Sequence, residues 1–138
     1  MTDGIVLIHA FPLDSSMWAP QIEEVGRDVK VIAPDLPGFG AATPHGEVMS
    51  MSAAADEVAR AIKAAGLGRA LVVGLSMGGY VALALWRQHR ELVSGFVFAN
   101  TKAEGDDEAG AERRRQLAAR LRSEGSGFLV ESPPPLLS

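Results

Sequence analysis

The sequence predicts an α/β fold, with a mostly parallel sheet and helices on both of its faces. Two observations carry this prediction. Short runs rich in β-branched residues, almost free of polar residues, suit strands buried on both faces. These runs alternate with helical patterns, and such alternation requires helical crossovers between parallel strands. With 138 residues, the chain is long enough for one domain with a buried core.

The first strands and the first helix fall within the first 40 residues. Residues 5–9 form an uninterrupted apolar run that predicts a buried strand, and residues 18–25 predict a short helix. Residues 29–34 predict a second strand that ends at a proline. The segment 35–40 is dense in turn formers and predicts a turn.

A helix is predicted over residues 50–66, followed by further alternation. Ser50 is placed to cap its start and Gly66 to end it at the C′ position. One apolar face recurs at three- and four-residue spacing: Ala55, Val58, Ala59 and Ile62. A strand at 70–74, a helix at 77–89 and a strand at 93–99 complete the pattern.

Beyond residue 101 the composition changes. Residues 102–138 contain six basic and seven acidic residues. Residues 112–122 predict a helix, 128–130 form a last apolar patch, and the proline-rich segment 132–138 predicts an interruption with no capping strand or helix.

Composition and charge exclude several classes of protein. A net charge of −4 argues against binding to nucleic acid, which requires a basic face. The chain has no cysteine and three histidines, so we expect no disulfide and no metal site. A mean hydropathy of +0.11 and short apolar stretches predict no membrane association. Without a recognisable signal peptide, a cytoplasmic location is expected.

The motif Gly74-Leu75-Ser76-Met77-Gly78 predicts a nucleophilic serine. It lies between a predicted buried strand and a predicted helix, the context of a G-x-S-x-G nucleophile elbow. Such a turn is sharp and strained, and side chains beside it would collide with backbone, which explains its glycines. The helix N-terminus favours negative charge that develops nearby. A dinucleotide fingerprint and a phosphate-binding P-loop are both excluded by the residues present.

Two further motifs precede the elbow. His9-Ala10-Phe11-Pro12 directly follows the first predicted strand, and Asp35-Leu36-Pro37-Gly38-Phe39-Gly40 follows the second. With the elbow, and Gly79 after it, they resemble the α/β-hydrolase family: an H-G-x-P oxyanion loop, a D-x-x-G-x-G turn and the elbow, in the family's order. The Ser-Met-Gly-Gly sequence is similar to the branch of small esterases, enol-lactonases and cofactor-free haloperoxidases.

The resemblance implies a role for each of these residues. Ser76 would be the nucleophile, and the backbone amides of Phe11 and Met77 would form the oxyanion hole. His9 would be structural, with its ring holding the oxyanion loop by hydrogen bonds, and Asp35 would fix its turn. Gly74, Gly78 and Gly79 would give the elbow its space. Ala10 stands where the family pattern has glycine.

The family's remaining catalytic residues are expected to be missing. Its chain order is serine, then an acid, then histidine. The only histidine downstream of Ser76 is His89, which a 13-residue helix would carry about 20 Å away. His45 lies upstream in a loop. We therefore expect the N-terminal portion of the fold, truncated before its last strands: residues 1–101 as part of the core, and 102–138 as the start of a helical lid.

These observations leave two main hypotheses about function. The chain is part of a serine hydrolase of a small ester or lactone, inactive unless another segment completes it, or it is a non-catalytic fragment that folds by self-association or by binding a partner chain. A hydrolase-fold binding protein or a haloperoxidase-like protein that uses the same pocket is a third hypothesis. No cofactor is expected. The expected partners are a small acyl substrate and either a second copy or a complementing C-terminal segment.

Overall fold

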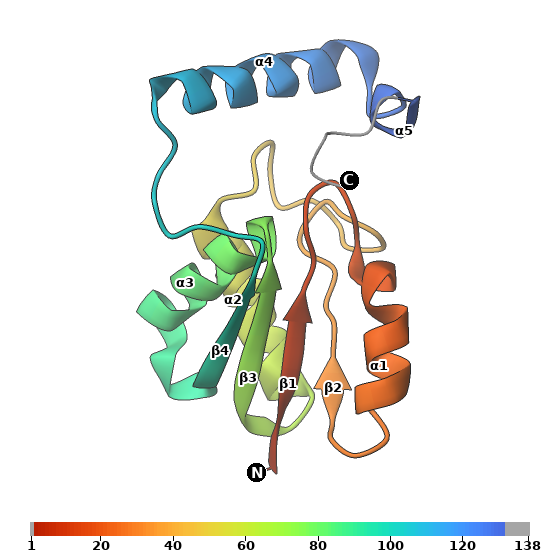
Figure 1. Cartoon of the computed structure of the whole chain (residues 1–138), viewed down its shortest axis with the longest axis vertical. Coiled ribbons are helices and arrows are strands. Elements are labelled where there is room, and N and C mark those ends of the chain that lie inside the picture. Colours follow the sequence, from red (N-terminus) through yellow and green to blue (C-terminus); the bar gives the residue numbers. More distant parts are fainter. Residues whose placement is uncertain (1, 132–138) are drawn as a thin grey trace. The chain divides into compact units, whose positions relative to one another are not determined.

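The computed structural model describes residues 2–131, and Figure 1 shows its elements. The chain divides into two compact units, with the boundary between Ala103 and Glu104. The proline-rich segment 132–138, predicted to be an interruption, lies outside the described residues.

The first unit is built on one parallel sheet. Its strands are β1 (Thr2–Ile8), β2 (Val31–Ile32), β3 (Leu67–Leu75) and β4 (Val93–Ala99). They lie in the order β2-β1-β3-β4, and every neighbouring pair is parallel. The predicted fold class, a partial parallel sheet with helical crossovers, is confirmed.

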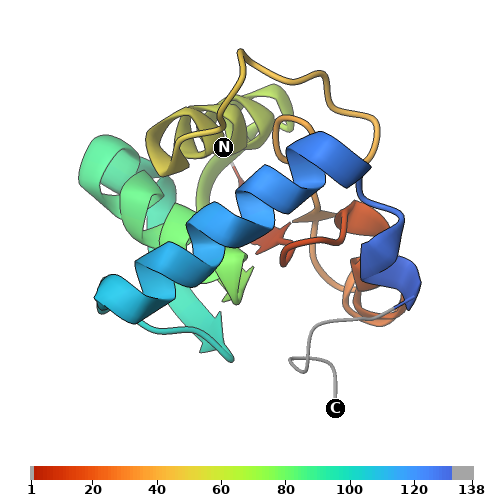
Figure 2. The ribbon, with the colours of Figure 1, turned by 90° about the horizontal axis from the view of Figure 1, so that it is seen from above.

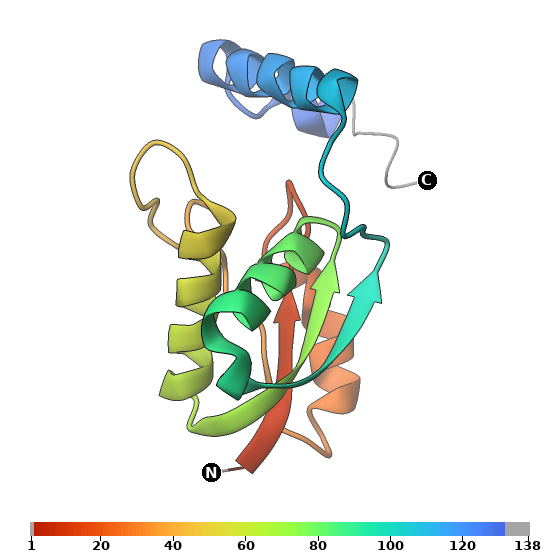
Figure 3. The ribbon, with the colours of Figure 1, turned by 90° about the vertical axis from the view of Figure 1, so that its left-hand side faces the viewer.

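Helices cover both faces of this sheet. A 3₁₀ turn, η1 (Ser15–Trp18), leads into α1 (Ala19–Val25) on one face. The other face carries α2 (Met51–Ala64) and α3 (Met77–His89), on the opposite side from α1 (Figure 3). These two helices lie side by side (Figure 2). The short turn η2 (Arg90–Leu92) joins α3 to β4.

The boundaries of α2 follow from its capping residues, as predicted. The Ser50 hydroxyl accepts a hydrogen bond from the Ala53 amide at 3.0 Å. At the other end Gly66 has a φ of +70°, a conformation that glycine adopts without cost. The apolar face of the helix is fully buried at Ala55, Val58 and Ile62. These side chains belong to the main core, together with Val6, Ile8, Leu36, Leu67, Val72, Val81 and Leu85.

The two edges of the sheet differ in length. The predicted strand over 29–34 is reduced to the two residues of β2. Pro34 has no amide to donate, and β2 pairs with β1 alone because it lies at the edge of the sheet. The opposite edge is the seven-residue β4, on which Val97 and Phe98 are 45% and 46% exposed. The sheet therefore presents a long apolar edge on one side only.

The second unit, as far as it is described, is helical. Its long helix α4 (Glu108–Glu124) starts four residues before the predicted 112–122, because the Asp107 carboxylate accepts a hydrogen bond from the Gly110 amide at 2.7 Å. A short helix α5 (Phe128–Glu131) follows. The Arg120 guanidinium lies 3.8 Å from the centre of the Phe128 ring. A lid role for 102–138 stays a prediction.

The strand order also locates the switch point of the sheet. From β1 the chain crosses to β2 on one side and then returns to β3 on the other, so the direction of winding reverses between β1 and β3. In open α/β sheets, ligands bind beyond the carboxyl ends of the strands at such a switch point. The residues that directly follow β1 and β3 are His9 and Ser76.

Candidate active site

Ser76 occupies a strained turn between β3 and α3. Its φ of 52° and ψ of −112° are unusual for a residue with a side chain. Such a conformation costs about 1–3 kcal/mol and persists only where the surroundings impose it. Because α3 begins at the next residue, Met77, the serine sits at the N-terminus of a 13-residue helix.

The glycines on either side of Ser76 are required for space. A Cβ at Gly74 would lie 2.5 Å from the Gly78 carbonyl oxygen and 2.8 Å from the Gly79 nitrogen. A Cβ at Gly78 would overlap the Ile8 carbonyl oxygen and lie 3.0 Å from that of His9. Side chains are therefore excluded at both positions, and the first turn of α3 packs directly on the backbone at the end of β1.

His9 is fully buried and its ring joins two loops. Its Nε2 accepts a hydrogen bond from the Leu36 amide at 3.0 Å, and Nδ1 lies 3.0 Å from the Ala10 carbonyl oxygen, to which it donates. The ring is therefore neutral, with its proton on Nδ1. Since the lone pair on Nε2 is already used, His9 is not available as a base for Ser76.

Phe39 adds apolar contacts to the same loops. Its ring meets that of His9 edge to face at a centroid distance of 5.2 Å, and that of Phe11 at 6.2 Å. The loop after β1 is thus held by the loop after β2 through both a buried hydrogen bond and aromatic packing.

Asp35 fixes the second of these loops. Its carboxylate accepts hydrogen bonds from the backbone amides of Ser15 at 2.8 Å and Ala41 at 2.9 Å. Partial burial acts to raise the pKa of Asp35, but the amides of Ala41 and Ser15 outweigh it and hold that pKa below its ordinary value. A Cβ at Gly40 would lie 2.5 Å from the Asp35 carboxyl carbon, so a glycine is needed for this turn.

The two predicted oxyanion-hole donors follow β1 and Ser76. Met77 is the first residue of α3, where helix amides have no intrahelical partner. Phe11 lies in the loop that the His9 ring supports. Among residues 2–131, only Ser76 and Asn100 combine a side chain with a positive φ. Ala10 therefore takes the place of the family's glycine with an ordinary negative φ.

Comparison with known proteins agrees with this geometry. The family model described as the alpha/beta hydrolase fold matches residues 4–123. The chain belongs to the α/β-hydrolase family. A thermophilic esterase from Thermogutta terrifontis, at 40% identity, superposes with a TM-score of 0.88 over 96% of this chain and 49% of its own. The enol-lactonase from Burkholderia xenovorans LB400 is 29% identical, with a TM-score of 0.79 over 96% and 50%.

Curated relatives include esterases of the same family. The pimeloyl-[acyl-carrier protein] methyl ester esterase from Vibrio atlanticus is 31% identical over 94 residues, which is 67% of this chain and 34% of the relative. This α/β hydrolase chain therefore spans about half the length of the two solved structures. Its sheet and elbow correspond to one part of a longer fold.

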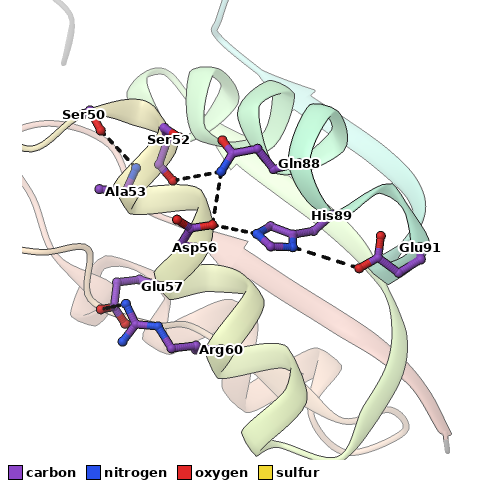
Figure 4. Close-up of polar contacts among 9 residues, drawn as sticks. All are labelled: Ser50, Ser52, Ala53, Asp56, Glu57, Arg60, Gln88, His89 and Glu91. Carbon is purple, nitrogen blue, oxygen red and sulfur yellow. Dashed lines mark hydrogen bonds and ion pairs between the residues drawn. The ribbon is translucent and has the colours of Figure 1, made fainter.

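The α/β-hydrolase triad needs a histidine, but His89 is the last residue of α3, whereas Ser76 directly precedes its first residue. Figure 4 shows the His89 ring pointing toward Asp56 of α2. Thirteen helical residues separate the two ends by about 20 Å. The His89 Nε2 contacts Asp56 Oδ1 at 2.7 Å, and its Nδ1 lies 4.0 Å from Glu91. Gln88 donates to the same Asp56 oxygen at 3.1 Å. This cluster joins the end of α3 to α2.

The remaining histidine and two acids of the second unit have other contacts. The His45 Nε2 lies 3.2 Å from Glu57 Oε1, which also pairs with Arg60. In the second unit, Asp107 caps α4 and Asp106 pairs with Arg114. All three histidines of the chain thus have polar partners other than the Ser76 side chain.

Neither a metal cluster nor a membrane helix is present in the described part of the chain. Residues 2–131 bring no three His, Cys, Asp or Glu side chains together in a way that could hold a metal ion. None of their helices is long and apolar enough to cross a bilayer.

An apolar hollow of about 180 Å³ lies in the first unit, apart from the elbow. It is lined by residues of β1, β2, β3, η1 and α1: Ile5, Leu7, Trp18, Gln21, Val25, Val31 and Val73. Because this lining contains neither Ser76 nor Phe11, the hollow is not a pocket for an acyl group bound at the serine.

Sequence reasoning missed one group at the elbow. The Thr101 hydroxyl, two residues beyond β4, donates a hydrogen bond to the Ser76 carbonyl oxygen at 2.7 Å. No motif marks this threonine. A polar residue just after a parallel strand, at the edge of the sheet that carries the elbow, is the signal that points to it.

Proposed function

We propose that this chain carries the nucleophile and the oxyanion hole of a serine hydrolase that acts on a small ester or lactone. The supporting observation is the backbone of Ser76, held at a φ of 52° between β3 and the N-terminus of α3. Maintaining a strained conformation costs free energy, and such residues cluster at active sites. Ser76 also follows β3 at the switch point of the sheet.

The chemistry proceeds through an acyl-enzyme. The Ser76 Oγ attacks the acyl carbon and gives its proton to a general base, while the carbonyl electron pair moves onto the oxygen. The backbone amides of Phe11 and Met77 donate hydrogen bonds to that oxyanion. When the carbonyl re-forms, the bond to the leaving alkoxide breaks and the alkoxide takes the proton. Water then hydrolyses the ester on Ser76 by the same steps, without a cofactor.

The relatives support the proposed substrate class. The two solved structures described above are an esterase and an enol-lactonase, and the curated relative is a methyl ester esterase. All three names describe cleavage of an acyl–oxygen bond. A haloperoxidase-like reaction at the same serine is distinguished by assaying peroxide-dependent halogenation beside ester hydrolysis.

We further propose that the general base comes from a segment outside these 138 residues. His9 uses its Nε2 to accept the Leu36 amide, and His89 pairs with Asp56 at the far end of α3. That segment is a continuation of the chain or a complementing C-terminal polypeptide. Intact mass and a size measurement on the purified sample distinguish these two sources.

The placement of the histidines favours a second candidate, a non-catalytic fragment that folds by self-association or with a partner. A fluorophosphonate probe separates the two. In a preparation that contains the completing segment, we expect mass spectrometry to find the adduct on Ser76, none in Ser76→Ala, and full labelling in the control Ser94→Ala, which changes an exposed serine.

Either of two results decides between the candidates. If Ser76 is unlabelled in the completed preparation, the hydrolase proposal is wrong. If the 138-residue chain alone hydrolyses an ester and Ser76→Ala abolishes the turnover, the non-catalytic candidate and the external base are both wrong.

A further inference from the structure

The end of β4 holds both backbone groups of the nucleophile. The Ser76 amide donates to the Ala99 carbonyl oxygen at 3.0 Å. The Ser76 carbonyl oxygen accepts two hydrogen bonds, from the Gly79 amide at 2.9 Å and from the Thr101 hydroxyl at 2.7 Å. Two of these three bonds therefore come from residues 99 and 101, more than 20 residues away along the chain.

A turn at Asn100 brings these two groups to the same residue. Asn100 has a φ of +42°, and asparagine is one of the few residues with a side chain that adopts this region readily. This turn follows the last residue of β4. It brings the Ala99 carbonyl oxygen and the Thr101 hydroxyl, one residue before and one residue after Asn100, to the Ser76 backbone. The two residues on either side of Asn100 thus each make a hydrogen bond to the Ser76 backbone.

Gly79 provides the room that Thr101 occupies. A Cβ at Gly79 would lie 2.6 Å from the Thr101 Cγ2 and 2.8 Å from its Cβ. The approach of Thr101 to the elbow thus requires glycine at position 79, which gives the second glycine of the Ser-Met-Gly-Gly sequence a specific reason.

The Ser76 carbonyl belongs to the same peptide unit as the Met77 amide. Among residues 2–131 the cis peptide bond is Phe11–Pro12, so the Ser76–Met77 bond is trans and planar, and its C=O and N–H point in opposite directions. A hydrogen bond to the carbonyl therefore orients the N–H on the other side of the plane. It also polarises the amide, which makes the N–H a stronger donor.

We propose that Thr101 is a positioning residue that orients and strengthens the Met77 amide as an oxyanion donor. This proposal rests on the proposed function, because it takes that amide to be part of the oxyanion hole. Thr101 does not touch substrate; it acts through the peptide plane between Ser76 and Met77. The Gly79 amide shares the same carbonyl, so loss of the hydroxyl weakens the arrangement without abolishing it.

Three variants separate the hydroxyl from simple packing. Thr101→Val keeps the shape and removes the donor, whereas Thr101→Ser keeps the donor and removes the methyl group. Thr43→Val makes the same chemical change at an exposed threonine and is the matched control.

The first measurement needs no activity. In NMR spectra of the 138-residue chain, we expect the Ser76 carbonyl carbon and the Met77 amide resonances to shift in Thr101→Val, to stay near wild type in Thr101→Ser, and to be unchanged in Thr43→Val. Wild-type shifts in Thr101→Val would overturn the proposal. So would equal displacement in both Thr101 variants, because packing by the methyl group would then explain the contact.

The second measurement uses the preparation in which the probe labels Ser76. Loss of a whole oxyanion donor lowers kcat by about 10²–10³-fold. Because the Met77 amide remains in Thr101→Val, we expect a smaller decrease, about 5–20-fold, in kcat with KM little changed, and recovery in Thr101→Ser. An unchanged kcat would overturn the catalytic part of the proposal. Failure of wild-type Ser76 to react, with the NMR shifts as expected, would instead refute the proposed function and leave the contact in place.

Discussion

The buried contact between His9 and Leu36 gives a sharp test of how the loop after β1 is held. In His9→Phe, an aromatic ring still fills the space, but the acceptor on Nε2 is gone. The Leu36 amide donates to this nitrogen at 3.0 Å, and Leu36 is fully buried. In the variant this amide has lost its acceptor. The variant therefore isolates the hydrogen bond from most of the packing.

The expected destabilisation follows from that one amide. A buried donor left without a partner costs about 1–3 kcal/mol. The urea dependence for a small domain is about 2 kcal/mol per molar, so a loss of about 2 kcal/mol lowers the unfolding midpoint by about 1 M.

The assay is urea unfolding followed by circular dichroism, with His45→Phe as the control. His45 is exposed and contacts Glu57 at the surface, so its replacement should leave the midpoint nearly unchanged. A His9→Phe midpoint equal to wild type would refute the reasoning.

Four further predictions use the same unfolding assay. Ser76→Gly should raise stability by about 1 kcal/mol, because glycine relieves the positive φ; a less stable variant would show that Ser76 is not strained. Asp35 has a pKa lowered below 3.8, so its stabilising effect is complete above that value and lost as pH falls through its folded pKa. Asp35→Asn should therefore be less stable at pH 7, with the difference shrinking in acid; a difference independent of pH contradicts this. Ser50→Ala should cost about 1 kcal/mol through loss of the α2 cap, and a change below a few tenths would mean that water replaces the cap. Gly79→Ala should cost about 1–3 kcal/mol by overlap with Thr101, and the added change Thr101→Gly should recover part of it; purely additive effects would exclude the overlap.

Much of the fold was predictable because its signals are local. The helix over 77–89 and the strand over 93–99 have the predicted boundaries, and the cap and stop of α2 lie at Ser50 and Gly66. The strand over 29–34 was overestimated, since pairing with β1 alone, and not the apolar run itself, determines where β2 ends.

Tertiary contacts around the elbow were less accessible to sequence reasoning. The motif locates Ser76, but nothing local to residues 74–78 indicates that Thr101 donates to its carbonyl. Likewise, a histidine after a strand does not reveal that its Nε2 accepts from residue 36. Both contacts join segments at least 25 residues apart, and they depend on which strands the sheet brings together.

The way the elbow holds its serine has a consequence for engineering. The groups that fix residue 76 bind its amide and its carbonyl, and they come from Ala99, Gly79 and Thr101. None of these bonds uses the serine hydroxyl, so they do not depend on which side chain stands at position 76. Position 76 is therefore an exchangeable site: a cysteine placed there would inherit the same backbone and the same neighbouring amides, and under the proposed function it would form a thioester in place of the ester.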